Sequence, residues 1–197
     1  IGVAGAWSRF DESDLVSATV EGSLIMGMSQ CSVDQMVAYY NSAGRTYPAA
    51  TYSNYGAPTL RRFCELVYEQ AAAEGVRAEV LFCQAMKETG WLQFGGQVLP
   101  TQCNFGGIGA TDGGAHGATF PNVATGLLAQ AQHLKAYATI APLNQTCVDP
   151  RYHLVPKGCA PYVEILGQKE NPTGHGWATA EGYGLSIVSM MKMLSRY

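Results

Sequence analysis

Residues 81–91 read LFCQAMKETGW, a run with the residue spacing of an α-helix that ends on a natural helix stop. Leu81 and Gln84 fall on one face of such a helix, because side chains three, four and seven positions apart are neighbours. Glu88 falls on that same face and so continues the stripe instead of lying opposite to it. Gly90 then supplies the left-handed position on which many helices end.

Glu88 has the surroundings of a carboxyl group that keeps its proton. It lies in the last turn of the predicted helix, near the negative end of the macrodipole, and its apolar setting also favours the neutral form. A carboxylic acid that stays protonated near neutral pH can serve as a general acid. Position alone equally allows an ordinary solvated glutamate at a fraying helix end.

The composition indicates a folded domain with few charges. Of the 197 residues, 47% are hydrophobic and 14% are charged, which is ample for a core and argues against disorder. The net charge of −3 and a pI near 5.8 argue against nucleic acid or an anionic membrane as the main partner, and no stretch is apolar enough for membrane insertion. We expect a monomer with one domain over 32–197, preceded by a lead-in over 1–31 that packs on the body or tethers it.

Capping residues and apolar periodicity predict about five helices. They are expected from Ser32 to Ser42, from Pro58–Thr59 to Glu74, through the run that carries Glu88, from Gly126 to Tyr137 and from Leu185 to Leu194. Ser32 and Gln35 form a capping box at the first of them, and Thr125 caps the fourth. The predicted fold class is α+β, predominantly α-helical, with a small β-hairpin lobe or flap.

A glycine-rich stretch from Gly95 to Gly117 predicts one wall of a cleft. Glycines permit positive φ and close approach of the backbone to a ligand. Residues 104–109 within it read NFGGIG, which has neither Rossmann nor P-loop spacing, and no lysine follows. No nucleotide cofactor is therefore predicted. The β-hairpin is expected inside this stretch, and Asp112 and His116 are expected either at the cleft border or in solvent.

Six cysteines are present, and Cys147 and Cys159, which flank a loop, are the best candidates for a disulfide. The sequence has no closely paired cysteines and no His-x3-His spacing. Neither a structural metal nor any other cofactor is therefore predicted.

Glycoside cleavage needs a protonated acid beside the glycosidic oxygen and a means of stabilising the oxocarbenium-like transition state. Glu88 fits the acid. By residue type alone, the candidates for a second carboxylate are Asp112, Asp149, Glu164, Glu170 and Glu181. A substrate with a 2-acetamido group offers another route, in which its own carbonyl oxygen attacks the anomeric carbon. Glu88 would then be the main protein acid, with a tyrosine such as Tyr183 placed to stabilise charge.

Three segments resemble, in the same order, those of one enzyme family. They are ETGW at 88–91, NFGGIG at 104–109 and WATAEGYG at 177–184. They look like the ETGW, NLFGIK and YATDPxYA segments of bacterial peptidoglycan N-acetylglucosaminidases, glycoside hydrolase family 73, and the similarity runs from about Pro58 to the C-terminus. The resemblance implies a lysozyme-like, mostly helical fold with a β-lobe. It also implies an extracellular, cell-wall-associated enzyme that hydrolyses the β-1,4 bond after N-acetylglucosamine in the peptidoglycan glycan strand.

The resemblance implies roles for individual residues. Glu88 matches the catalytic acid and Tyr183 the second tyrosine of the late segment, and Asp112 is the best candidate for the second acid. Substrate contacts are implied for Trp91, Asn104, Phe105, Trp177 and Glu181.

Several positions depart from the family pattern, among them Trp177, which replaces the first tyrosine of the late segment. Ala180 replaces the usual aspartate, with Glu181 beside it, while Gly106 replaces the phenylalanine and Gly109 the lysine of the middle segment. Contacts at the cleft floor are therefore expected to differ.

Three other functions compete with this prediction. A lytic transglycosylase would cleave the same polymer without water, but the order of the motifs argues against it. A non-catalytic glycan-binding module would have no need of an acid in an apolar setting. A cysteine peptidase would use Cys83 or Cys103 with His116 or His133, and no local nucleophile signature supports it.

Overall fold

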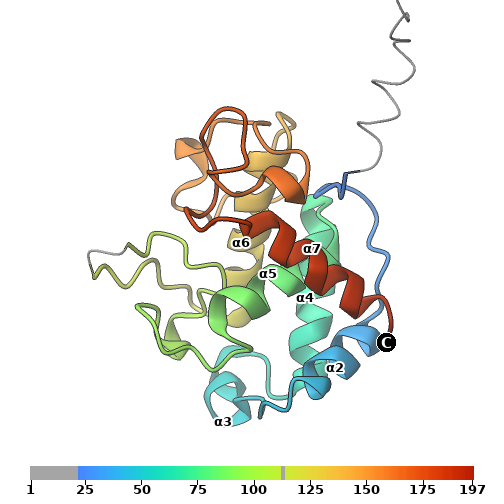
Figure 1. Ribbon diagram of the computed structural model, residues 1–197. Coiled ribbons are helices and arrows are strands. Elements are labelled where there is room, and N and C mark those ends of the chain that lie inside the picture. The colour runs from blue at the N-terminus through green and yellow to red at the C-terminus, as the bar shows by residue number, and fades with distance from the viewer. Residues whose placement is uncertain (1–21, 112–113) are drawn as a thin grey trace, which may run out of the picture.

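Six α-helices form the body of the part of the chain that the computed structural model describes, residues 22–111 and 114–197 (Figure 1). They run over Val33–Ser42 (α2), Ala49–Tyr52 (α3), Leu60–Glu74 (α4), Ala78–Thr89 (α5), Val123–Ala138 (α6) and Tyr183–Leu194 (α7). Short 3-10 turns lie at Ser53–Tyr55 (η1), Pro100–Gln102 (η2), Tyr152–Leu154 (η3) and Val163–Ile165 (η4). The predicted fold class, predominantly helical and lysozyme-like, is confirmed.

Helix α5, which carries Glu88, lies in the centre of the helical body and packs against α4, α6 and α7 (Figure 1). The sequence predicted an apolar stripe along one face of this helix. Every residue from Ala78 to Met86 is buried, so the helix is instead enclosed on all sides. Gly90, with φ 56°, ends the helix as predicted. Glu88 therefore stands where α5 leaves the core.

The predicted start signals of α2 and α4, and the predicted end signal of α4, are confirmed. Ser32 Oγ accepts from Gln35 N at 3.1 Å and Gln35 Oε1 accepts from Ser32 N at 2.8 Å, which completes the capping box of α2. Thr59 Oγ1 accepts from Arg62 N at 3.1 Å at the start of α4. Gly75, with φ 73°, ends α4.

The starts of α6 and α7 differ from the prediction. Helix α6 begins at Val123 and its N-cap is Asn122, whose Oδ1 accepts from Thr125 N at 2.8 Å, so Thr125 is a first-turn residue and not the cap. Helix α7 begins at Tyr183, two residues before the predicted start, because Gly182 with φ 69° turns the chain directly into the helix. This earlier start makes Tyr183 a helical residue.

The predicted β-hairpin is not confirmed. The described residues contain isolated bridges in place of strands, and within the glycine-rich stretch Ala110 bridges to His116. Asn104 holds this loop instead, because its amide donates to the carbonyl oxygens of Ile108 (2.9 Å) and Ala118 (3.1 Å) and its oxygen accepts from Ile108 N (3.0 Å). The Gln102 amide also donates to the carbonyl oxygens of His116 (3.0 Å), Gly117 (3.3 Å) and Ala118 (3.3 Å), so two side chains brace the loop together with a few backbone hydrogen bonds.

The described end of the predicted lead-in, residues 22–31, lies against the helical body (Figure 1). Leu24 forms an antiparallel bridge with Tyr162, and the Ile25 side chain is fully buried. Residues 1–21 lie outside the described residues.

All six cysteines lie in the described residues and all are free thiols. The candidate disulfide between Cys147 and Cys159 is therefore not formed in this structure. The Cys147 thiol donates to the carbonyl oxygen of Asp149 at 3.4 Å, while the Cys159 carbonyl is held by the Asn171 side chain at 3.0 Å. These two hydrogen bonds fix the cysteines to different parts of the loop region.

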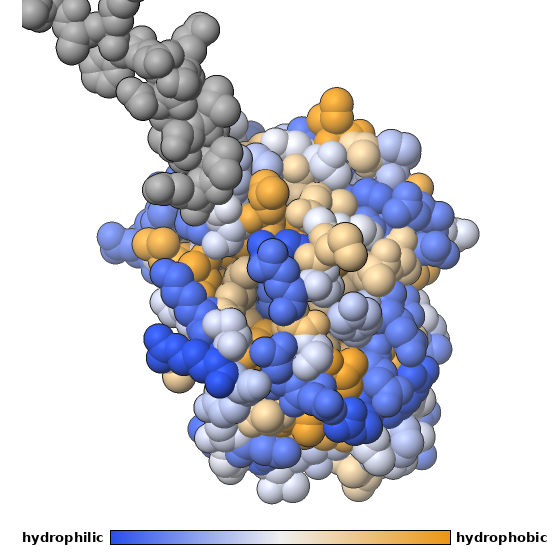
Figure 2. Space-filling view, turned by 90° about the vertical axis from the view of Figure 1, so that its right-hand side faces the viewer, coloured by the Kyte–Doolittle hydropathy of each residue, from blue (hydrophilic) through white to orange (hydrophobic). Residues whose placement is uncertain are grey.

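Hydrophobic side chains are scattered on the face of the molecule that Figure 2 shows. Orange residues occur there in small groups among blue and white ones and form no broad patch. In the described chain, no helix has the length and apolar character needed to cross a membrane.

Gly184 allows α7 to approach η4, and its replacement by alanine is expected to disturb the start of α7. A Cβ at this position would collide with the backbone carbonyl of Val163, which cannot rotate away as a side chain can. We expect Gly184→Ala to destabilise the fold by roughly 1–3 kcal/mol and to shift Tyr183, which precedes it. Ser189→Ala, on the exposed side of α7, should leave the melting temperature nearly unchanged. Equal melting temperatures for the two variants would contradict this description of α7.

Candidate active site

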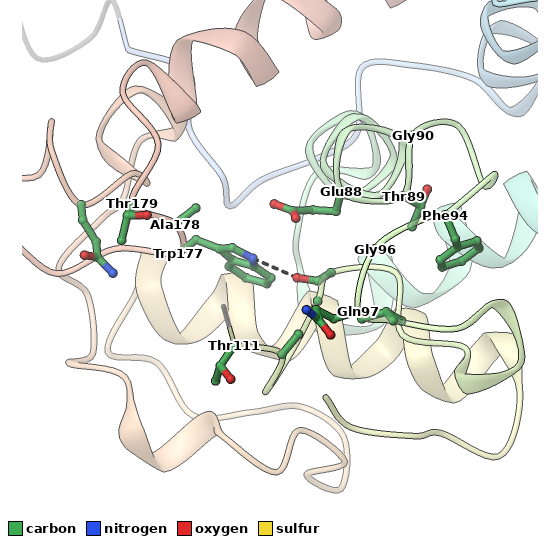
Figure 3. Close-up of a pocket in the computed structure, with 15 residues that line it drawn as sticks. Glu88, Thr89, Gly90, Phe94, Gly96, Gln97, Thr111, Trp177, Ala178 and Thr179 are labelled. Atoms are coloured by element: carbon green, nitrogen blue, oxygen red, sulfur yellow. Dashed lines mark hydrogen bonds between the residues drawn. The ribbon is translucent and has the colours of Figure 1, made fainter. Parts of the chain in front are cut away.

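A cleft of about 540 Å³ opens beside the C-terminal end of α5 (Figure 3). Its walls come from parts of the chain that are far apart in sequence. The end of α5 contributes residues 88–90, the glycine-rich region contributes residues from 94–98 and 106–111, and the loop before α7 contributes residues from 168–179. The glycine-rich stretch and the late aromatic segment therefore line the same cleft as Glu88, as predicted.

The Glu88 carboxyl group is paired with the Tyr183 hydroxyl. The hydroxyl donates to Glu88 Oε1 at 2.5 Å, and Tyr183 itself is buried. Because Tyr183 is the first residue of α7, this hydrogen bond joins the end of α5 to the start of α7. Glu88 is exposed to the cleft while Tyr183 is enclosed behind it, so the tyrosine fixes the carboxyl group from the protein side.

The setting of Glu88 raises the pKa of its carboxyl group. Desolvation by the surrounding protein is the main cause, and the Tyr183 hydroxyl and the Lys87 ammonium, which both lower the pKa, do not cancel it. Water still reaches the side chain from the open cleft, so crowding at a concave wall and not complete enclosure causes the shift. A reachable carboxyl group with a raised pKa is suited to donate a proton.

The setting of Tyr183 favours the protonated form of its hydroxyl group. Burial and the neighbouring Glu88 raise the pKa of its hydroxyl well above the ordinary value. The group is thus available as a permanent hydrogen-bond donor to Glu88.

Trp177 forms a second wall of the cleft. Its indole Nε1 donates to the carbonyl oxygen of Gly106 at 3.1 Å, and Figure 3 shows this bond within the same pocket as Glu88. The ring meets His133 edge to face at 4.6 Å between centroids, and His133 Nδ1 lies 2.7 Å from Asp149 Oδ2. His133 is thus a structural support behind Trp177.

The described carboxylates other than Glu88 do not line the cleft. Asp149 is buried beside His133, and Glu164 accepts from Ser23 N at 2.9 and 3.0 Å. Glu170 accepts from Gly182 N at 3.3 Å, and Glu181 is exposed outside the lining. Asp112, the best sequence candidate for a second acid, lies outside the described residues, next to Thr111, which lines the cleft.

Three of the five residues predicted to contact substrate lie beneath or beside the cleft lining. Trp91 packs edge-on against Tyr39 and Tyr40, at 5.0 and 5.9 Å between ring centroids. Phe105 is fully buried in the core, and Asn104 is buried as the brace of its loop. Of the five, Trp177 is the one that lines the cleft, since Glu181 also lies outside the lining.

Sequence reasoning missed several polar and aromatic residues at the cleft and behind it. Phe94, Gln97, Gln168 and Thr179 line the cleft, and Gln84 lies directly behind Tyr183, to whose oxygen it donates at 3.0 Å. The signal for Gln84 was present, because it precedes Glu88 by four residues and therefore shares its helix face. Thr179 lies in the late segment at 177–184 but was not singled out there, and Phe94, Gln97 and Gln168 carry no local pattern that marks them.

The geometry disfavours a cysteine peptidase. Burial raises the pKa of the Cys103 thiol to about 12 and that of Cys83 well above its ordinary value, so neither is a ready thiolate. The two histidines are engaged elsewhere, since His116 Nδ1 lies 2.6 Å from the carbonyl oxygen of Gln97 and His133 pairs with an aspartate. Among the described residues, no group of three or more His, Cys, Asp and Glu side chains is arranged to hold a metal ion.

Two comparisons with known proteins gave matches. The model of the glucosaminidase family, described as mannosyl-glycoprotein endo-beta-N-acetylglucosaminidase, matches residues 64–196. An uncharacterised protein of Borreliella burgdorferi is 36% identical over 129 residues, which are 66% of this chain and 60% of that relative. The chain thus spans less than two thirds of the length of the curated relative that it matches. Solved structures gave no match.

Proposed function

The chain belongs to the glucosaminidase family, and from this premise we propose that it hydrolyses the β-1,4 glycosidic bond after N-acetylglucosamine in bacterial peptidoglycan. Membership of this family supports the hydrolysis of a glycan. The exact bond and polymer are our proposal. The observation that supports it best is the Glu88 carboxyl group, which has a raised pKa, faces an open cleft and is held by Tyr183. Because peptidoglycan lies outside the cytoplasmic membrane, we also propose an extracellular, cell-wall-associated role of the autolysin type.

Glu88 acts as the general acid in this proposal. Its proton passes to the glycosidic oxygen as the bond from that oxygen to the anomeric carbon breaks, so the sugar leaves as a neutral alcohol. A water molecule then supplies the hydroxyl group that replaces the leaving sugar at the anomeric carbon. The Glu88 carboxylate that remains is stabilised by the Tyr183 hydroxyl at 2.5 Å and can accept a proton from that water.

Two routes to the anomeric carbon differ in what they require. An inverting route needs a second carboxylate about 6.5–9.5 Å from Glu88 to activate water, and Asp112 is the sequence candidate. Substrate assistance needs only the acetamido carbonyl oxygen of the sugar, and it fits the described cleft lining, in which Glu88 is the sole carboxylate. NMR of the freshly released anomer distinguishes them, since inversion gives the α-anomer and substrate assistance gives the β-anomer. Asp112→Asn should abolish the first route and spare the second.

The identity of the new reducing ends tests the proposed bond. Purified peptidoglycan is digested, reduced with borohydride and analysed by mass spectrometry. We expect N-acetylglucosaminitol ends. N-acetylmuramitol ends would mean that the other glycosidic bond is cut, 1,6-anhydro ends would identify a lytic transglycosylase, and tight binding without fragments would identify a glycan-binding module.

Tyr183→Phe is expected to lower kcat by about 10- to 100-fold while KM changes little, because the hydroxyl contacts Glu88 and not the cleft. The basic limb of the pH profile should also move. The hydroxyl lowers the pKa of Glu88, so its removal raises that pKa and extends activity to higher pH. An unchanged kcat, or a limb that moves to lower pH, would remove Tyr183 from the mechanism.

A further inference from the structure

Two buried glutamines lie behind Tyr183 in one line of hydrogen bonds that ends at Glu88. Gln130 Nε2 donates to Gln84 Oε1 at 2.9 Å, and Gln84 Nε2 donates to Tyr183 Oη at 3.0 Å. The Tyr183 hydroxyl then donates to Glu88 Oε1 at 2.5 Å. Both glutamines are 0% exposed and Tyr183 is buried, so solvent cannot replace the hydrogen bonds among these three side chains. The line runs from α6 through α5 to α7 and back to the end of α5.

The direction of this line follows from the number of protons that each group has. A phenol has one proton, and since the Gln84 amide already donates to the Tyr183 oxygen, that proton is directed at Glu88. The reverse direction would leave the buried NH₂ group of Gln130 without an acceptor. The observed direction leaves only Gln130 Oε1 unpartnered, and a buried acceptor without a partner is tolerated better than a buried donor.

This direction determines which oxygen of Glu88 carries the acidic proton. Because Oε1 accepts from Tyr183, the proton of the neutral carboxyl group resides on Oε2. Oε2 is directed to the cleft, since a Cβ placed on Gly107, which lines the cleft, would lie 3.9 Å from it. Figure 3 shows the Glu88 carboxyl group reaching from the end of α5 into this space.

We propose that Gln84 and Gln130 are positioning residues that hold Tyr183 as a donor to Glu88 Oε1 and so keep the transferable proton on Oε2. As a statement about catalysis, this inference rests on the proposed function of Glu88. Each amide in the line polarises the next donor, so the two glutamines strengthen the bond from the Tyr183 hydroxyl to the carboxylate. Neither glutamine lines the cleft, so neither contacts substrate in this arrangement.

Few ionisable groups in the described chain can disturb a titration of Glu88. Lys87, on the same helix, and Tyr183 are the two that influence its pKa, and Lys87 Nζ lies 5.5 Å from the centre of the Tyr183 ring. The cleft segments 94–98, 106–111 and 177–179 carry no ionisable side chain. Asp112 lies outside the described residues, so every titration is repeated with Asp112→Asn.

The test is a ¹³C NMR titration of the Glu88 carboxyl carbon in the whole free protein, with the signal assigned by its loss in Glu88→Gln. Gln84→Met keeps the length of the side chain but removes the donor to Tyr183. The bond to the carboxylate weakens, and the pKa of Glu88 should therefore shift upward. Gln130→Met should shift it in the same direction by less. Gln132→Met is the matched control, because Gln132 is as buried on the same helix but donates to Glu74, and it should leave the titration unchanged.

A wild-type measurement covers the case in which a variant fails to fold. The side-chain NH₂ signals of Gln84 and Gln130 should shift with the same midpoint as Glu88. The proposal is overturned if these signals do not respond at that midpoint, or if folded Gln84→Met and Gln130→Met leave the pKa of Glu88 unchanged or lower it. The titration needs no substrate. If the wild-type protein did not cleave glycan, the proposed function would be refuted, but the titration would still test whether the two glutamines act on Glu88. With an active enzyme, Gln84→Met should lower kcat about tenfold at unchanged KM.

Discussion

Glu88→Gln is expected to lower the rate of peptidoglycan cleavage by about 100- to 10,000-fold, the usual contribution of a general acid. Glutamine has nearly the same shape, and its oxygen can still accept from the Tyr183 hydroxyl. It has no acidic proton to give, so the sugar must leave as an unprotonated alkoxide. The measurement is the release of soluble fragments from purified peptidoglycan, with the melting temperature as the check of folding.

A matched control separates this loss from a general effect of removing a carboxylate. Glu69 is exposed on α4, and its partner is Arg62 at 3.0 Å. Glu69→Gln should therefore keep the wild-type rate. A folded Glu88→Gln that releases fragments at the wild-type rate would show that Glu88 is not the acid, whatever its pKa.

The largest expected effect on stability comes from a buried ion pair far from the cleft. Glu74, at the end of α4, is completely buried and lies 3.1 Å from Lys135 Nζ on α6. It also accepts from Asn144 N at 2.8 Å and from Gln145 N at 3.2 Å, and so joins the loop after α6 to both helices. Removing one partner of such a pair leaves the other charge buried without compensation, which costs about 3–5 kcal/mol.

Glu74→Leu and Lys135→Met should each lower the free energy of unfolding by about this amount, or the melting temperature by about 2–4 °C for every kcal/mol. The double variant should lose much less than the sum, because no charge then remains buried. Asp34→Asn, which breaks an exposed pair with Arg61 at 2.7 Å, should change stability by less than about 1 kcal/mol. Additive losses in the double variant would contradict the pairing.

The same pair predicts a loss of stability in acid. Burial alone would raise the pKa of Glu74, but its hydrogen bonds to Asn144 N, Gln132 and Lys135 lower the pKa below the ordinary value of 4.5. A folded-state pKa below the unfolded one gives stability that is present above the ordinary value and is lost as the pH falls through the folded pKa. Urea unfolding at stepwise lower pH should show this loss in the wild type and lack that component in Glu74→Leu.

The sequence was sufficient for those parts of the site that depend on local chain geometry. The spacing from Leu81 to Glu88 and the stop at Gly90 are properties of one helix, so they could be read without knowledge of the fold. Tyr183 was found through a motif, and the structure explains its place, since Gly182 turns the chain into α7 at that residue.

The sequence did not reveal the features that long-range packing decides. Trp91 belongs to the motif, yet the chain reverses through Gly90 and Trp91, with φ 56° and 59°, and the indole packs on Tyr39 and Tyr40. The hairpin was expected from glycines, but the side chains of Asn104 and Gln102 brace that loop. The role of the Gln84 side chain depends on its hydrogen bonds to Gln130 on α6 and Tyr183 on α7, which only the folded chain brings together.

The most direct test of the central claim, that Glu88 protonates the leaving oxygen, varies the leaving group. Oligosaccharide substrates that end in N-acetylglucosamine are prepared with a sugar or with 2,4-dinitrophenolate as the leaving group, and the wild type is compared with Glu88→Gln. Dinitrophenolate departs without a proton, so the loss caused by Glu88→Gln should be large for the sugar and nearly absent for dinitrophenolate. An equally large loss on both substrates would contradict the claim.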